Sequence, residues 1–230
     1  MNFFEARFTR KIQENSDSYS FVMEIPDGFS WKAGQHALFR LTDREVAEGD
    51  RDSRVFTIAS APEDGCLMFT TRIAEPHSSY KEQLLRGLAP GDVLLVAPAL
   101  GDFDLHFEKE RSLIVAGGIG ITPARSLLRH YSEQGAGEHL VSVFYSDNRG
   151  EYVYGDFWKE TERKMPGLEI RLFSDQDEFT NRVKTYAAEH GNAAEYLIAG
   201  SPGMNSFFTK LLGELGIEKE NLLTDNFMGY

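Results

Sequence analysis

The spacing of apolar residues changes near residue 110, and this change constrains the fold more than any other feature. Before it, short segments alternate apolar and polar residues, as half-buried strands do, and glycines separate them. These segments cover residues 3–12, 18–25, 36–41, 54–60, 67–73 and 92–98. Because most of them follow one another without a helix between, they predict an antiparallel barrel or sandwich. One helix is expected at 79–88, with Ser79 as its N-cap.

After residue 110, short apolar strands alternate with amphipathic helices. Strands are expected at 111–118, 139–146, 168–174, 195–200 and 221–227, and helices at 122–135, 154–164, 179–191 and 202–216. Such alternation produces right-handed crossovers and a parallel sheet. We therefore predict a β domain at 1–108 and an α/β domain at 109–230.

Charge and cysteine content exclude several classes of protein. The 24 basic and 36 acidic residues give a formal net charge of −12, which repels nucleic acid and anionic lipid. The acidic run at 42–53 is interpreted as a solvated loop. The single cysteine, Cys66, excludes a disulfide framework, a multi-thiolate zinc site and a cysteine-ligated iron–sulfur cluster within the chain. With no apolar run near the ~18 residues of a membrane span and no secretory signal, we expect a cytoplasmic protein without a bound metal.

Two glycine-rich turns follow predicted strands of the second half. In "AGGIGITP" (116–123), Thr122 is expected to cap the next helix and Pro123 to fit its first position. The second turn is "AGSPGM" (199–204). Either turn alone is compatible with a tight connection that binds nothing. Together, at the carboxyl ends of parallel strands, they predict a crevice for a dinucleotide, with its pyrophosphate at a helix N-terminus.

Several motifs, in one order along the chain, resemble those of the ferredoxin–NADP reductase superfamily. "RVFTIAS" (54–60) is similar to the flavin motif R-x-[YF]-[ST]-x-x-S, "GGIGITP" to the nicotinamide-dinucleotide motif, and "AGSPGM" to the second nucleotide turn. "WKAGQHALFRL" and "LAPGDVLLV" resemble two of the family's strands, and the closing "DNFMGY" resembles its aromatic C-terminus. The resemblance extends from about Trp31 to Tyr230.

The resemblance implies a Greek-key β-barrel that binds flavin, followed by a Rossmann-like NAD(P)-binding domain. It implies an oxidoreductase that moves a hydride from NAD(P)H to bound FAD and then electrons to a separate acceptor, without a general base. Arg54 would contact the flavin phosphate, Phe56 would pack on the isoalloxazine ring, and Thr57 would hydrogen-bond near flavin N5. Tyr230 would stack on the ring and move aside for nicotinamide. Further cofactor-binding candidates are Ser60, Arg72, Ser78, Ser79, Gly117, Gly118, Gly120, Thr122, Pro123, Ser146, Arg149, Gly200, Ser201, Pro202, Met204 and Phe227.

Departures from the family pattern leave alternatives open. "EPHSSY" lacks the glycine that usually precedes the pyrophosphate helix, so FMN is an alternative to FAD. Ala199 stands where many members have cysteine, and His77 is interpreted as a surface histidine. For Ser60 the alternative is a turn hydroxyl that bonds its own backbone. Phe103 is a candidate for contact with adenine.

The nucleotide and the electron acceptor are not decided by the sequence. Arg149 would suit the 2′-phosphate of NADPH, whereas Asp147 would accept hydroxyls from the ribose of NADH. A ferredoxin- or flavodoxin-type carrier is acidic and would need a local basic patch, with candidates Arg10, Lys11, Arg72, Lys81 and Arg86. An oxygenase component, free flavin or a ferric chelate is an alternative acceptor. A nucleotide-sensing role without catalysis is an alternative function.

Overall fold

The N-terminal part of the chain forms a six-stranded antiparallel sheet. The computed structural model describes residues 2–135 and 137–225. The strands are β1 (Phe4–Gln13), β2 (Ser18–Met23), β3 (His36–Leu41), β4 (Ser53–Thr57), β5 (Leu67–Arg72) and β6 (Val93–Val96), in the order β4-β3-β6-β1-β2-β5. A bridge between Ile58 and Phe69 brings β4 beside β5 and closes the sheet into a barrel. The predicted antiparallel barrel is confirmed.

Aromatic side chains fill the barrel. Phe21 and Phe39 are fully buried and contact Phe69, with ring centroids 5.1 and 4.6 Å from that ring. Phe56 stacks on the same ring at 4.4 Å, with 2° between the planes. Each such pair contributes about 0.5–1.5 kcal/mol beyond its buried area. The core therefore fixes Phe56 at the barrel surface, with one face covered.

The predicted helix at 79–88 is present but differs in its details. It consists of α1 (Ser79–Glu82) followed by a π-helical turn, Gln83–Gly87. Its N-cap is Ser78, whose hydroxyl accepts the amide hydrogen of Lys81, so the assignment of Ser79 as cap was wrong. The Ser79 hydroxyl instead donates to Asp50 at 2.7 Å, a partner 29 residues earlier.

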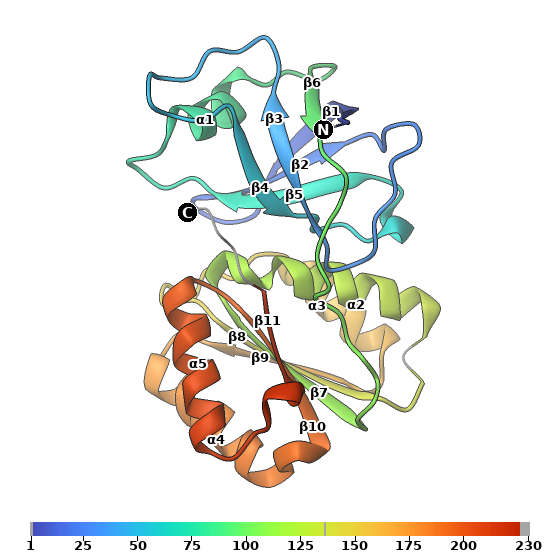
Figure 1. The fold of residues 1–230 in the computed structure, drawn as a ribbon, viewed down its shortest axis with the longest axis vertical. Coiled ribbons are helices and arrows are strands. Elements are labelled where there is room, and N and C mark those ends of the chain that lie inside the picture. Colours follow the sequence, from blue (N-terminus) through green and yellow to red (C-terminus); the bar gives the residue numbers. More distant parts are fainter. Residues whose placement is uncertain (1, 136, 226–230) are drawn as a thin grey trace.

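The C-terminal part forms a five-stranded parallel sheet covered on both faces. Its strands are β7 (Arg111–Gly117), β8 (Leu140–Ser146), β9 (Leu168–Phe173), β10 (Ala194–Ala199) and β11 (Leu222–Asp225), in the order β11-β10-β7-β8-β9. The helices are α2 (Thr122–Gln134), α3 (Gly155–Lys164), α4 (Gln176–His190) and α5 (Pro202–Glu214). The α2 and α3 helices pack on one face and α4 and α5 on the other (Figure 1). The parallel sheet predicted from the strand–helix alternation is confirmed.

Two helix starts were predicted incorrectly. The α4 helix begins at Gln176 rather than 179, because the Asp175 carboxylate caps it by accepting the amide hydrogen of Glu178 at 2.8 Å. Thr122 does not cap α2. The Gly118–Ile121 segment forms a 3₁₀ turn that continues into α2, and the Thr122 hydroxyl donates to the Ile119 carbonyl at 3.1 Å.

The α2 helix docks the two domains together (Figure 1). Asp64 of the barrel receives hydrogen bonds from Arg125 at 2.8 Å and from Arg129 at 3.0 Å, while the Ser126 hydroxyl donates to the Ser60 carbonyl at 2.8 Å. These contacts hold the barrel over the carboxyl ends of the parallel strands. Among the described residues, no helix is long and apolar enough to cross a membrane.

Candidate functional site

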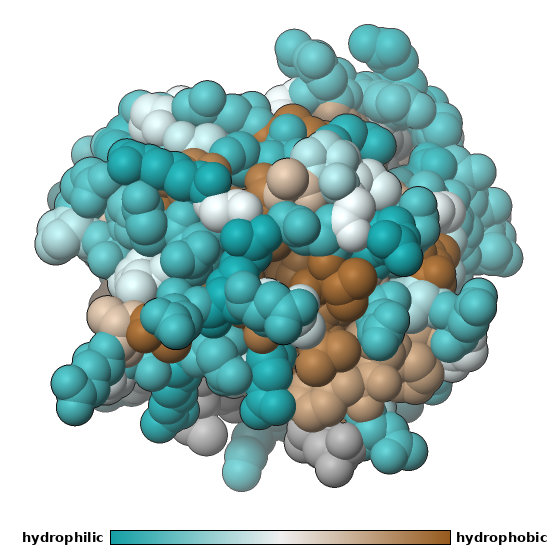
Figure 2. Space-filling model, turned by 90° about the horizontal axis from the view of Figure 1, so that it is seen from above, coloured by the Kyte–Doolittle hydropathy of each residue, from teal (hydrophilic) through white to brown (hydrophobic). Residues whose placement is uncertain are grey.

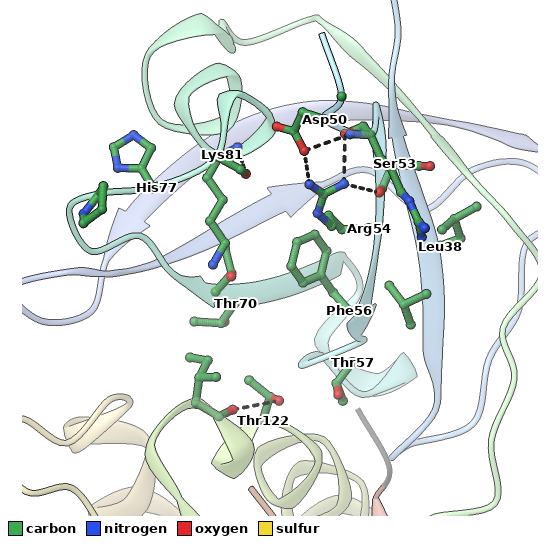
Figure 3. A pocket seen from close by; sticks show the side chains of 17 residues that line it. Leu38, Asp50, Ser53, Arg54, Phe56, Thr57, Thr70, His77, Lys81 and Thr122 are labelled. Carbon is green, nitrogen blue, oxygen red and sulfur yellow. Dashed lines mark hydrogen bonds and ion pairs between the residues drawn. The ribbon is translucent and has the colours of Figure 1, made fainter. Parts of the chain in front are cut away.

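A first cavity of about 600 Å³ opens along β4, between the barrel and the start of α2. Figure 3 shows Arg54, Phe56 and Thr57 in a row along its wall. Three of the sequence's flavin-motif candidates therefore face one space. Residues that line it are Leu38, Gly49, Asp50, Arg51, Ser53, Arg54, Val55, Phe56, Thr57, Thr70, Thr71, Pro76, His77, Ser78, Lys81, Ile119 and Thr122.

Asp50 holds Arg54 in place. The two form an ion pair, and Arg54 also donates to the carbonyls of Arg51 at 2.9 Å and Ser53 at 2.8 Å. Burial alone would raise the pKa of Asp50, but hydrogen bonds from the Ser79 hydroxyl, the Tyr80 amide and the Arg54 guanidinium hold it well below its ordinary value. Asp50 lies in the acidic run interpreted as solvated, and for this residue that interpretation was wrong. No sequence signal linked it to its partner Ser79.

Thr57 presents a buried polar atom to the first cavity. Its side chain is 3% exposed, and among the described residues its Oγ1 has no hydrogen-bond partner. A buried hydroxyl left in this condition costs about 1–3 kcal/mol. The geometry therefore suits a ligand that hydrogen-bonds this atom, above the flat apolar ring of Phe56.

Ser60 lies off the cavity. It is fully buried, and its hydroxyl accepts the amide hydrogen of Met68, on the neighbouring strand β5, at 2.9 Å. This bond differs from the predicted one to its own turn, because it joins the segment after β4 to strand β5. Ser60 therefore supports the barrel behind the motif.

Positive side chains gather at one end of the first cavity. Lys81 donates to the Arg72 carbonyl at 2.8 Å, and its pKa is lowered by burial and by the charges of Arg54 and Arg72. Lys81 was predicted only as part of a docking patch, yet its side chain lines the cavity interior. His77 was interpreted as a surface residue, but its side chain is 7% exposed and bonds Glu82 at 2.8 Å. This end of the cavity suits an anion.

The glycine turns form one wall of a second cavity, of about 1000 Å³. They follow β7 and β10, which are neighbours where the strand order reverses, as predicted for a crevice. A Cβ at Gly117 or Gly200 would collide with the Met204 sulfur, and one at Gly120 with the Ala199 carbonyl. These glycines let the two turns approach each other. Residues lining the cavity include Arg72, Lys81, Gly117, Gly118, Ile119, Ser146, Asp147, Arg149, Ser201, Gly203, Met204 and Phe207.

Helix α5 begins at the second cavity. The Ser201 hydroxyl caps it by accepting the amide hydrogen of Met204 at 3.2 Å, and Pro202 follows in the first turn. Pro123 is buried in the first turn of α2, at the second helical position rather than the predicted first, because the helix begins at Thr122. The two cavities share Pro76, Lys81 and Ile119 in their walls. Ligands in the two spaces would therefore meet.

The remaining candidates are placed as follows. Arg149 lines the second cavity but is paired with Asp17 of the barrel. Phe103 is buried between the domains and lines neither cavity. Phe227 and Tyr230 lie outside the described residues.

Asp225, at the carboxyl end of β11, was not a candidate. It pairs with Ala199 in the sheet, and burial raises its pKa to about 7. Among the described residues its Oδ2 has no partner, while its carbonyl accepts from Asn205 at 2.7 Å. The described part of the chain contains no group of three or more metal-ligating side chains.

Comparisons with known proteins agree with this architecture. Residues 114–210 match the model of the oxidoreductase NAD-binding domain. The Na⁺-translocating NADH-quinone reductase of Klebsiella pneumoniae has an F subunit that is 25% identical over 229 residues, covering 90% of this chain and 56% of that protein. Its counterpart in Actinobacillus succinogenes is 27% identical, covering 76% of this chain and 49% of that protein. The chain thus spans about half the length of these relatives.

Solved structures of low sequence identity share the fold. Ferredoxin–NADP⁺ reductase from Plasmodium falciparum superposes with a TM-score of 0.80 at 17% identity, covering 97% of this chain and 96% of that one. A cytochrome P450 reductase from Amycolatopsis gives 0.81 at 18% identity, covering 99% of this chain and 70% of that one. Both domains are therefore arranged as in these reductases. Taken with the NAD-binding match and the ordered motifs, this arrangement makes the chain similar to the ferredoxin–NADP reductase superfamily in fold, with a NAD-binding oxidoreductase domain at residues 114–210.

Proposed function

We propose that the protein is a flavin-dependent NAD(P)H oxidoreductase. Residues 1–108 would hold FAD in the first cavity, and residues 109–230 would hold the nicotinamide dinucleotide in the second. A bound flavin supplies the chemistry, because it accepts a hydride from reduced nicotinamide and passes electrons to an acceptor. The shared wall at Pro76, Lys81 and Ile119 supports transfer between the two spaces. The chain's own residues bind, orient and exclude water.

Thr57 is the observation that carries the proposal. A flavin ring has both a flat apolar face and a hydrogen-bonding edge, and Phe56 and Thr57 offer a complement to each. The Phe56 ring is backed by Phe69 and is therefore rigid. The Thr57 hydroxyl needs a partner that no described residue supplies. The Arg54 and Lys81 side chains, at the far end, would attract the phosphate of FAD or, as an alternative, FMN.

The second cavity has the parts that a dinucleotide requires. The glycine turns allow close approach of a pyrophosphate, and the capped N-terminus of α5 offers amide hydrogens and a favourable dipole. Phe207 lines this cavity and is 48% exposed. Its ring offers a stacking face for adenine.

The proposed acceptor is a separate protein of modest charge. Of the basic residues predicted to form a docking patch, Arg72 is paired with Asp17 and Arg86 with Glu82. The pairing of two of the five bases reduces the positive charge that the patch offers to an acidic carrier. Figure 2, which looks onto the barrel end, shows mainly hydrophilic side chains, with the largest apolar area near the centre and smaller ones around it. The paired bases also favour, as a second candidate function, reduction of free flavin or a ferric chelate.

An anaerobic titration tests the proposal. The purified protein, supplied with FAD or FMN, is titrated with NADH and then NADPH while its visible absorbance is recorded. We expect flavin bands that bleach with at least one nucleotide. A protein that binds no flavin would refute the proposal, and one that binds flavin but is never reduced would favour a sensing role.

A further inference from the structure

A residue of the barrel holds an arginine that lines the second cavity. Asp17 lies in the turn between β1 and β2, and its carboxylate accepts two hydrogen bonds from Arg149, which is 132 residues later in the chain. The distances are 2.8 Å from Nη1 to Oδ2 and 2.9 Å from Nη2 to Oδ1. A bidentate pair of this kind fixes both the position and the direction of the guanidinium.

Other acidic groups surround the same guanidinium. Asp147 Oδ1 lies 3.8 Å from Arg149 Nε, and Glu151 Oε2 lies 3.6 Å from Nη1. Three carboxylates thus face one arginine. The Asp17 carboxylate is shared with Arg72, whose Nε donates to Oδ2 at 2.8 Å. Counting both arginines, the group has one more negative than positive charge.

The turn that carries Asp17 is rigid. The Asn15 side-chain oxygen accepts the amide hydrogen of Ser18 at 2.8 Å, and its Nδ2 donates across the domain boundary to the Glu151 carbonyl at 2.7 Å. Asp17 itself is only 14% exposed. Burial would raise its pKa, but the hydrogen bonds from Arg149 and Arg72 lower it overall, so the carboxylate is ionised at neutral pH.

The location of this group bears on the nucleotide. Asp147 and Arg149 follow β8, the strand next to β7, and both line the second cavity. In dinucleotide sites, an acidic residue at such a place accepts from the ribose 2′-hydroxyl of NAD, whereas a free arginine accommodates the 2′-phosphate of NADP. Here a phosphate would meet the Asp147 carboxylate and an arginine whose two terminal nitrogens are already bonded to Asp17, with Glu151 close by.

We infer that this site selects NADH over NADPH, and that Asp17, a residue of the other domain, maintains the selection by holding Arg149 away from a 2′-phosphate. The inference rests on the proposed function, because it takes the second cavity to be a nicotinamide-dinucleotide site. Asp17 acts through Arg149 and is therefore a positioning residue. It need not touch the nucleotide.

The test is a calorimetric titration of the full, flavin-loaded chain with NAD⁺ and, separately, with NADP⁺. For the wild-type protein we expect NAD⁺ to bind at least about tenfold more tightly. Asp17→Asn and Asp17→Ser free the guanidinium and should lower the NADP⁺/NAD⁺ ratio of dissociation constants by about threefold or more, chiefly by tightening NADP⁺. Asp17→Glu keeps the charge and should restore the ratio. The double variant Asp17→Asn with Arg149→Ala should lose the tighter NADP⁺ binding expected for Asp17→Asn, because the freed guanidinium is absent.

A surface carboxylate provides the control. Asp156 pairs with Lys159 on the solvent-exposed face of α3, and Asp156→Asn should leave both dissociation constants unchanged. Variants are compared only where their flavin absorbance and melting temperature match those of the wild type. The ratio of the two dissociation constants in the wild-type protein tests the selection of NADH without any variant. Tighter or equal binding of NADP⁺ by the wild type overturns the selection. A selective wild type whose ratio is unaffected in both neutral variants overturns the role of Asp17. Failure to bind either nucleotide refutes the proposed function instead.

Discussion

Replacing Thr57 by valine should change stability and flavin binding in opposite directions. Valine has the same shape, and it removes a hydroxyl that is 3% exposed and has no partner among the described residues. An unsatisfied buried polar group costs about 1–3 kcal/mol, so relief of even the lower value stabilises the flavin-free protein by about 1 kcal/mol. For a chain of this length, that corresponds to a rise in melting temperature of about 2–4 °C.

The same substitution should weaken flavin binding. The proposed hydrogen bond between Thr57 and flavin is lost, and flavin binding no longer gives a partner to an unsatisfied hydroxyl. We therefore expect binding to weaken by about 1.4 kcal/mol, which is tenfold in affinity. Thermal unfolding of the flavin-free protein measures the first effect, and fluorescence titration with FAD measures the second. Thr57→Ser keeps the hydroxyl and should resemble the wild type in both.

Thr161 provides a matched control for this substitution. It is equally buried, but its hydroxyl donates to the Phe157 carbonyl within α3 at 2.8 Å. Thr161→Val should therefore destabilise the protein by about 0.5–1.5 kcal/mol and leave flavin affinity unchanged. The reasoning fails if Thr57→Val destabilises the flavin-free chain as Thr161→Val does, or if it binds FAD as tightly as the wild type.

Three further predictions concern charged groups. Asp64→Ala removes the acceptor shared by Arg125 and Arg129, both mostly buried, and should lower the free energy of unfolding by about 2–3 kcal/mol in urea titrations, with no change expected for Asp156→Asn. The folded-state pKa of Asp50 is lowered, so the ionised carboxylate stabilises the folded state above its ordinary pKa of 3.8, and this stabilisation is lost as pH falls below it. The melting temperature of Asp50→Asn should therefore fall less steeply with decreasing pH than that of the wild type. The folded-state pKa of Asp225 is raised to about 7, so the folded protein keeps a proton that the unfolded chain releases, and the free energy of unfolding falls as pH rises from about 4 to 7. This fall amounts to at most about 4 kcal/mol, and Asp225→Asn should not show it. If the difference in the free energy of unfolding between the wild type and Asp225→Asn does not vary with pH, the raised pKa of Asp225 is contradicted.

The elements of the fold could be predicted because their signals are local. Strand β3 has a period of two in "HALFRL", and α2 has Ala124, Leu127 and Leu128 on one face, all fully buried in the structure. The crevice was also predictable. Two glycine turns identify two strand ends, and parallel sheets bring such ends to one edge, as β7 and β10 show.

The missed residues depend on partners that are distant in sequence. Asp50 and Asp17 are ordinary acidic residues in polar segments, and only the fold brings Ser79 to one and Arg149 to the other. Lys81 was predicted only as part of a docking patch for an acidic carrier, yet its ammonium group donates to the Arg72 carbonyl and its side chain lines the cavity. The choice between Ser78 and Ser79 as N-cap depended on backbone dihedrals, which adjacent serines do not reveal.

The excess of acidic residues has different effects on long-range attraction of a partner and on binding inside the cavities. The net charge of −12 describes the field far from the protein, which disfavours anionic partners. Inside the first cavity, the Asp50 carboxylate is paired with Arg54 and hydrogen-bonded by its neighbours. Lys81 is a partly buried cation that has no acidic partner among the described residues. Beside the second cavity, Asp17 engages both terminal nitrogens of Arg149. A carboxylate that holds an arginine is thus present beside both cavities. At the first we expect Arg54 and Lys81 to bind a phosphate together, whereas at the second we expect the carboxylates around Arg149 to disfavour the 2′-phosphate of NADPH.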